Sequence, residues 1–182
     1  VGAQRLVVKG FAAFAHIEHA AVEHDVAAHL AHVHAPPLLD AHVRRERAEK
    51  VYRETDGGLF AAMVEHGPDP DNPGWHHWNL KDETLFNGAV MGKLITCVDE
   101  DGKARLRMFP ERRHMNLQGV IHGAVTLSLI DIALFVTMHR IGTGNAGPSV
   151  TLELSTQFVG GGDPQRPLDA VTEIVRETGK LV

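Results

Sequence analysis

The stretch that most constrains the fold runs from residue 114 to residue 135 and reads HMNLQGVIHGAVTLSLIDIALF. After its opening histidines and asparagine it is almost wholly apolar. It is too long for an average strand, so it predicts a helix, and Gly142, just after the basic Arg140, supplies a stop signal for that helix. A helix that is apolar nearly all round must be covered on most of its sides. The segments that flank it in sequence have to supply that cover.

Two β-prone segments precede this helix and two follow it. Residues 92–98 (GKLITCV) and 104–109 (ARLRMF) lie on either side of DEDGK, where Asp101-Gly102 is a hairpin turn signal. Residues 149–159 (SVTLELSTQFV) and 168–177 (LDAVTEIVRE) are separated by the Gly-rich turn GGGDPQRP. The order strand, strand, helix, strand, strand predicts an α+β domain in which an antiparallel β-sheet wraps around one long central helix.

The first part of the chain has a different character. Residues 11–50 are rich in Ala and His, and residues 67–75 (GPDPDNPGW) form a Pro/Gly/Asp linker. We therefore expect an N-terminal His/Ala-rich extension over 1–69, helical in structure, and a main domain over 70–182. The residues GKLV at 179–182 look like the start of a further hairpin, so the expectation is that the C-terminal strands are truncated. Val rather than Met at position 1 fits a fragment of a longer reading frame.

Composition narrows the classes of function. A chain of 182 residues with 43% hydrophobic content can bury one good core. Its 18 Lys+Arg against 23 Asp+Glu give a formal charge of −5 without a long basic stripe, so nucleic acid is not an expected partner. No run reaches the roughly 18 uninterrupted apolar residues of a membrane span, and we expect a cytoplasmic protein that does not bind membranes. The single cysteine, Cys97, excludes an internal disulfide and is expected to be a buried thiol.

One carboxylate, Asp131, interrupts the apolar stretch. No Lys or Arg lies between His114 and His139, so the helix itself offers Asp131 no counter-charge. Removing an unpaired carboxylate from water is costly, and such a residue usually faces a polar cavity or takes part in chemistry. The alternative is a core aspartate that is satisfied by backbone groups or water.

Helix geometry separates Asp131 from the histidine at the start of the stretch. Asp131 lies nine positions after His122, which is about 13 Å along a helix and about 180° around it. The two side chains therefore cannot meet at one carbonyl group within one chain. If both belong to a single site, two copies of the chain must form it, which predicts a homodimer or a dimer of dimers.

Five residues together carry a family resemblance. Asn116, His122, Gly123, Asp131 and Ser149 follow the spacing Asn-x5-His-Gly-x7-Asp-x17-Ser, which resembles that of the PaaI-type acyl-CoA thioesterases of the hotdog fold. The resemblance covers roughly residues 70–182. It implies hydrolysis of an acyl-CoA thioester at a dimer interface, with no cofactor beyond the CoA of the substrate.

The resemblance also implies a role for each residue. Asp131 is the general base or the nucleophile, the amide of Gly123 holds the thioester oxygen, and Asn116, His122 and Ser149 orient water and substrate. The chemistry fits, because an attacked thioester carbonyl becomes an oxyanion, and positive dipole and free N–H groups converge at a helix N-terminus. Taken singly, His122 reads as a helix-start residue, Asn116 as a turn residue and Ser149 as a polar strand residue.

One departure from the family lies beside the expected site. The family commonly has two glycines after the histidine, whereas this chain has Gly123-Ala124, which adds one methyl group beside the pocket. That methyl group narrows the approach of the thioester but leaves the Gly123 amide in place.

The phosphates of CoA need cationic or amide partners near the mouth of the site. Arg112, Arg113, Gly160 and Gly161 are the nearest candidates in sequence. The alternative is that the arginines are surface residues and that the glycines only close a hairpin.

Two further groups of residues have structural interpretations. His16, His19 and Glu23 would share one face of a helix, but nothing completes a coordination sphere, so a solvated helix is expected and no metal site is predicted. Trp75 and Trp78 are expected to be packing anchors where the N-terminal segment meets the main domain, with a lid over an acyl pocket as the alternative.

Three classes of function remain open. The first is hydrolysis of an acyl-CoA by way of Asp131. The second is a hotdog hydratase or dehydratase, in which a catalytic histidine works with a carboxylate at a different spacing. The third is a non-catalytic acyl-CoA-binding or regulatory protein, for which an intact Asp131 and Ser149 would be unnecessary.

Overall fold

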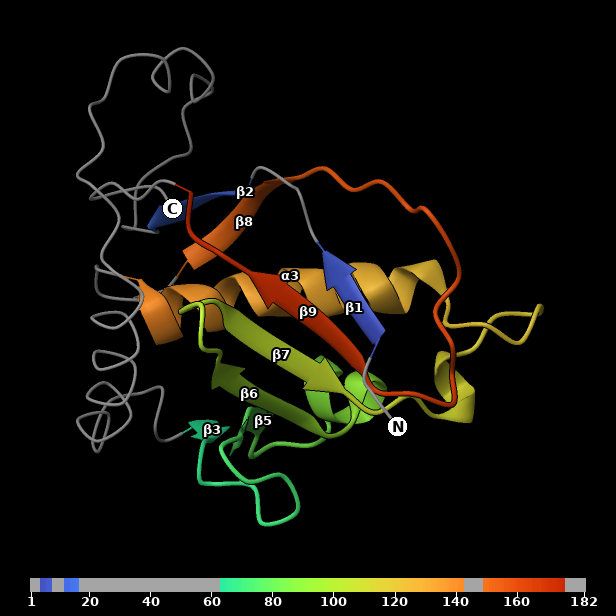
Figure 1. Ribbon diagram of the computed structural model, residues 1–182, viewed down its shortest axis with the longest axis horizontal. Coiled ribbons are helices and arrows are strands. Elements are labelled where there is room, and N and C mark those ends of the chain that lie inside the picture. Colours follow the sequence, from blue (N-terminus) through green and yellow to red (C-terminus); the bar gives the residue numbers. More distant parts are fainter. Residues whose placement is uncertain (1–3, 8–11, 17–62, 143–148, 176–182) are drawn as a thin grey trace.

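The computed structural model describes residues 4–7, 12–16, 63–142 and 149–175. A five-stranded sheet with the order β1-β9-β7-β6-β4 packs against one long helix, α3 (Figure 1). The strands of this sheet are, in chain order, β1 (Gln4–Val7), β4 (His76–His77), β6 (Leu94–Val98), β7 (Ala104–Met108) and β9 (Leu168–Thr172).

Shorter elements surround this sheet. Two pairs of strands lie outside it, β2 (Ala12–His16) with β8 (Ser149–Leu154), and β3 (Val64–Glu65) with β5 (Asn79–Leu80). A π-helical turn, η1 (Asn87–Met91), and a 3-10 turn, η2 (Arg112–His114), precede α3, which spans Gly123–Ile141.

The predicted α+β class, with an antiparallel sheet on one long helix, agrees with this arrangement. Neighbouring strands in the order β9-β7-β6-β4 are all antiparallel. The exception is β1, which pairs with β9 in parallel and which the sequence did not predict.

The N-terminal segment differs from its prediction at residues 4–7 and 12–16. Residues 4–7 and 12–16 are strands, β1 and β2, where a helical extension was expected, because their backbones pair with β9 and β8. The buried Val64 of β3 pairs with Leu80, so the packed structure also begins before residue 70. His19, Glu23 and the rest of 17–62 lie outside the described residues, as does GKLV at 179–182.

The predicted hairpin before the helix is confirmed. Strands β6 and β7 pair from Leu94↔Met108 to Val98↔Ala104. The Asp99 carboxylate accepts hydrogen bonds from the backbone N–H groups of Asp101 and Lys103, and Gly102 takes a φ of 71°, which favours glycine.

The predicted helix is also confirmed, and Gly142 ends it. The N–H of Gly142 donates to the carbonyl of Met138, and a Cβ at Gly142 would lie 2.3 Å from that carbonyl oxygen, so only glycine fits here. By length and composition α3 could cross a membrane, but 61% of its most apolar 18-residue window is buried inside the protein. It is therefore the central helix of the core.

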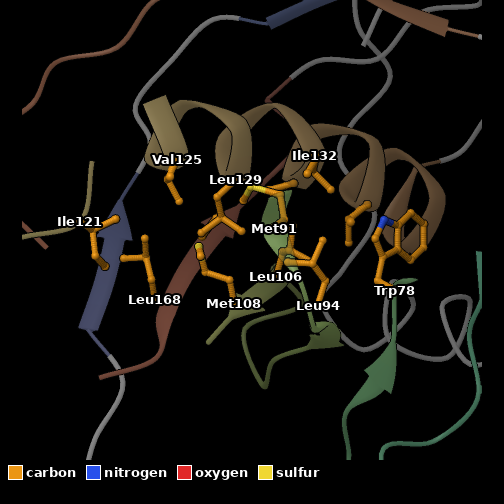
Figure 2. Close-up of a cluster of buried hydrophobic side chains, with 13 residues drawn as sticks. Trp78, Met91, Leu94, Leu106, Met108, Ile121, Val125, Leu129, Ile132 and Leu168 are labelled. Atoms are coloured by element: carbon orange, nitrogen blue, oxygen red, sulfur yellow. The ribbon is translucent and has the colours of Figure 1, made fainter. Parts of the chain in front are cut away.

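The core lies between α3 and the sheet. Figure 2 shows side chains of α3, among them Leu129, pointing toward those of β6 and β7, among them Leu106 and Met108. All three of these side chains are fully buried. Trp78 belongs to the same cluster and its ring lies 5.5 Å from that of His139, so its predicted packing role is confirmed. Burial of His139 lowers its pKa to about 4.

The other face of the sheet carries an ion pair between neighbouring strands. The guanidinium of Arg107 in β7 donates two hydrogen bonds, of 2.7 and 2.8 Å, to the carboxylate of Asp169 in β9. Asp169 is only 1% exposed, and the ring of Trp75 lies 4.2 Å from the Arg107 guanidinium carbon. The pair therefore fixes β7 against β9 and is shielded by Trp75.

We expect Asp169→Ala to lower the free energy of unfolding by about 2–4 kcal/mol, because it leaves the Arg107 charge without its partner. Glu173→Ala is the matched control, since Glu173 pairs with Lys103 at 3.0 Å on an exposed surface, and its loss should change stability by less than about 1 kcal/mol. Urea denaturation measures both. Equal effects of the two substitutions would contradict the structural role of the buried pair.

Candidate functional site

The loop of residues 115–122 is held at its base by His114. This side chain is fully buried; its Nδ1 accepts from the N–H of Glu111 at 2.8 Å and its Nε2 donates to the carbonyl of Val90 at 2.7 Å. The backbone carbonyl of His114 accepts from the N–H of His122 at 2.8 Å. The loop therefore leaves and re-enters the fold at a fixed place, directly before α3.

Asn116 shapes this loop. Its Oδ1 accepts hydrogen bonds from the N–H groups of Gln118 at 2.9 Å and Val120 at 3.4 Å, and Gly119 takes a φ of 76°. The turn role that the residue type suggested is thus present. Within the described residues the Asn116 Nδ2 group donates to no acceptor, so this half of the amide is available to a ligand.

An open hollow of about 800 Å³ lies over the loop. It is lined by Arg112, Met115, Asn116, Leu117, Gln118, Gly119 and His122. Leu117 is fully exposed, and the guanidinium of Arg112 makes no ion pair or hydrogen bond with the described part of the chain. The hollow thus offers an apolar side chain, an amide and a free cation side by side.

The first amides of α3 are satisfied with one exception. The Nδ1 of His122 accepts from the N–H of Ala124 at 3.0 Å, and the His122 carbonyl accepts from Val125 and Thr126. This leaves the N–H of Gly123, which finds no acceptor among the residues that the structure describes. At the positive end of the helix dipole, such an N–H group is suited to an anionic oxygen.

Packing within the chain does not explain glycine at position 123. A Cβ there would meet only the ring of Phe158, at 3.6 Å, which is an ordinary contact distance. Its φ is not positive either. Close approach of a ligand to the backbone is another condition that favours glycine.

Asp131 lies two and a half turns further along α3, half-buried on the helix side that faces away from the core. Its Oδ1 accepts a hydrogen bond of 2.6 Å from the hydroxyl of Thr151 in β8. No Lys or Arg of the described ranges forms an ion pair with it, in line with the absence of a counter-charge on its own helix.

Sequence reasoning missed Thr151. The signal that could have found it is strand alternation, because residues two apart on a strand share one face. Ser149 and Thr151 are both half-buried in β8, whereas Val150 and Leu152 between and beyond them are exposed. Residue 149 therefore marks the side of β8 that faces α3.

The predicted site residues fall into two groups. Asn116, His122 and Gly123 lie together at the start of α3, while Asp131 and Ser149 lie further along the helix and on β8. The nine positions from His122 to Asp131 correspond to about 13 Å of helix. One chain alone does not bring all five residues to one point.

The candidate CoA-binding residues differ in whether contacts within the chain already engage them. Arg112 lines the hollow, whereas Arg113 is engaged by the Glu111 carboxylate at 2.9 Å and by the Ala89 carbonyl at 3.2 Å. Gly161 lies against Val120, where a Cβ would come within 3.1 Å of the Val120 side chain, whereas a Cβ at Gly160 would meet nothing within 4 Å. A packing function thus explains Gly161, and Arg112 is the better-placed cation.

The described residues contain neither a reactive cysteine nor a metal site. Burial raises the pKa of the Cys97 thiol to about 11, as expected for a packed rather than a nucleophilic cysteine. Among residues 63–142 and 149–175, no three His, Cys, Asp or Glu side chains converge as metal ligands would.

Residues 118–182 match the family model of the Thioesterase superfamily. This segment contains His122, Gly123, Asp131 and Ser149, together with the whole of α3, β8 and β9. The match supports a thioesterase-type function, in a superfamily that also has non-catalytic members, and agrees with a hotdog arrangement of sheet and helix. No curated protein and no solved structure matches the chain.

We expect Gly123→Ala to leave the free energy of unfolding within about 1 kcal/mol of wild type, because the added methyl meets only an ordinary contact. Gly142→Ala is the matched control and should destabilise by about 2 kcal/mol or more, because its methyl would overlap the Met138 carbonyl. Thermal and urea unfolding give both values. A strongly destabilised Gly123→Ala protein would assign the glycine to packing instead of ligand approach.

Proposed function

We propose that the protein is a cytoplasmic acyl-CoA thioesterase of the PaaI type, which hydrolyses an acyl-CoA thioester to the free acid and CoA. The observation that carries this proposal is the unpaired N–H of Gly123 at the start of an apolar helix that also bears the half-buried carboxylate of Asp131. The N–H of Gly123 is suited to stabilise an oxyanion, and the carboxylate of Asp131 is suited to act as a base or a nucleophile.

In the reaction, the oxygen of a water molecule attacks the thioester carbonyl carbon while Asp131 takes its proton. The carbonyl oxygen becomes an oxyanion, which the Gly123 N–H stabilises. Collapse of this intermediate breaks the carbon–sulfur bond, and the departing CoA thiolate takes up a proton. In the alternative, Asp131 itself attacks the carbonyl carbon and expels the CoA thiolate, which takes up a proton. Water then hydrolyses the resulting mixed anhydride to the free acid and the Asp131 carboxylate.

We further propose that the active site forms between two copies of the chain. The support is the distance along α3 between Gly123 and Asp131, together with an exposed apolar side chain beside Asp131. Leu127, one turn before Asp131 on α3, is 36% exposed. A second copy that covers this side of α3 would place its own Gly123 near Asp131 in a homodimer, or in each half of a dimer of dimers.

CoA would lie over the hollow in this proposal. The free guanidinium of Arg112 would pair with its phosphates, and the available Nδ2 of Asn116 and Nε2 of His122 would contact the pantetheine or the thioester. Arg113, Gly160 and Gly161 contribute less, because Arg113 is engaged by Glu111 and Gly161 packs on Val120.

Asp131→Asn should abolish thiol release from acyl-CoA substrates while the fold is kept, because the amide retains the shape of the side chain without its basicity. The measurement is release of free CoA from a panel of acyl-CoAs, followed with a thiol-reactive dye, with circular dichroism as the control for folding. An Asp131→Asn protein that releases CoA at a rate near wild type would contradict the mechanism. No thiol release by the wild-type protein from any member of the panel would favour a hydratase or a non-catalytic binding protein.

Mixing two variants that are each expected to be inactive tests whether the site is shared. Asp131→Asn removes the base, and the methyl group of Gly123→Ala is expected to block close approach of the thioester to the backbone N–H at position 123. After subunit exchange the mixture should regain about a quarter of wild-type sites, because about half of the dimers are mixed and each mixed dimer has one intact site. Native mass spectrometry confirms the exchange, and each variant alone is the control. Complete exchange without any recovery would place the whole site within one chain.

A further inference from the structure

The carboxylate of Asp131 has one described hydrogen-bond donor, the hydroxyl of Thr151. The two oxygen atoms lie 2.6 Å apart, within the range of strong hydrogen bonds to an ionised acceptor. The bond engages Oδ1 and leaves Oδ2 without a partner among the residues that the structure describes. Thr151 thereby makes the two carboxylate oxygens of Asp131 unequal.

The strand fixes the direction from which this bond comes. Thr151 is half-buried on the α3 side of β8, and its neighbours Val150 and Leu152 point to the exposed side. Asp131 has two rotatable side-chain bonds, and its nearest helical neighbour with a hydroxyl, Ser128, is turned away, because that hydroxyl donates to the Ala124 carbonyl at 2.8 Å. Only β8 therefore restrains the carboxylate in the described fold.

We propose that Thr151 is a positioning residue for Asp131, an inference that rests on the proposed thioesterase function. The Thr151 hydroxyl holds Oδ1 of Asp131, so that Oδ2 is the oxygen that takes the proton from water or attacks the acyl carbon. The family resemblance assigns a role on this strand to Ser149, whereas the contact with Asp131 is made two residues further on. A base must be held in the correct orientation to act, since small displacements of a reacting group greatly reduce the rate.

A purely structural role for the same bond is the competing explanation, because it also ties β8 to α3. Two substitutions separate the explanations. Thr151→Val keeps the shape and removes the donor, and Thr151→Ser keeps the donor and removes the methyl group. Ser128→Ala is the matched control, because it removes a hydroxyl one turn from Asp131 that does not contact the carboxylate.

We expect Thr151→Val to lower kcat by about 10- to 100-fold and to leave KM within about twofold of wild type. The expected loss is a part of the roughly 10²–10⁴-fold rate enhancement that a positioned base contributes. Thr151→Ser and Ser128→Ala should keep kcat within about threefold. Rescue by serine together with an unchanged KM identifies positioning. A Thr151→Val protein that keeps the wild-type kcat, or a Thr151→Ser protein that loses activity as fully as Thr151→Val, would overturn the proposal.

Crystal structures of wild type and of Thr151→Val decide the inference even if the thioesterase proposal fails. Absence of turnover in the wild-type protein contradicts the proposed function alone. Positioning predicts that Asp131 keeps a single carboxylate orientation in wild type and adopts another, or several, in Thr151→Val. An identical Asp131 orientation in both structures would overturn the positioning role, whatever the activity.

Discussion

Burial of one side of α3 against the sheet is the constraint on which the rest of the structure depends. The helix has 19 residues, and its inward side chains, such as Leu129 and Val136, are completely buried over β6 and β7. Because that side of α3 packs in the core, the helical repeat of 3.6 residues per turn determines the direction of every other side chain of α3. Asp131 follows Leu129 by two residues, about 200° around the helix, and so it faces away from the core.

The start of the helix is set by contacts from elsewhere in the chain. The buried His114 connects the turn before α3 to η1, because its Nε2 donates to the Val90 carbonyl in η1 while its Nδ1 accepts from the Glu111 N–H of its own turn. Ile121 receives a further restraint, because its N–H donates to the Gly162 carbonyl at 3.0 Å. The amide of Gly123 is thus presented from a rigid base, which is a requirement for stabilising charge without reorganisation.

The sequence predicted the elements that depend on local patterns. The β6–β7 hairpin follows from Asp101-Gly102, and α3 follows from its apolar run and the glycine at 142. The parallel pairing of β1 with β9 could not be predicted, because it joins residues at opposite ends of the chain without a local signal. For the same reason the N-terminal segment was expected to be helical where β1 and β2 are strands.

The sequence supplied the residue types of the candidate site but not their contacts. The spacing of Asn116, His122, Gly123 and Asp131 led to the site prediction, and helix geometry predicted that Asp131 lies apart from the other three. The hydrogen bond from Thr151 was not foreseen, because it depends on how β8 lies across α3 after a loop. The binding of Arg113 to Glu111 and Ala89 likewise depends on the position of η1.

Cys97 is a natural probe of unfolding, because its thiol is protonated in the folded protein. Its thiol is the only one in the chain, lies half-buried in β6 between β7 and β4, and has a pKa that desolvation raises to about 11. Thiol reagents act on the thiolate, so at neutral pH the folded protein should react slowly and the unfolded chain quickly. The rate of labelling at increasing urea concentration would therefore report the loss of structure around β6, without any introduced cysteine.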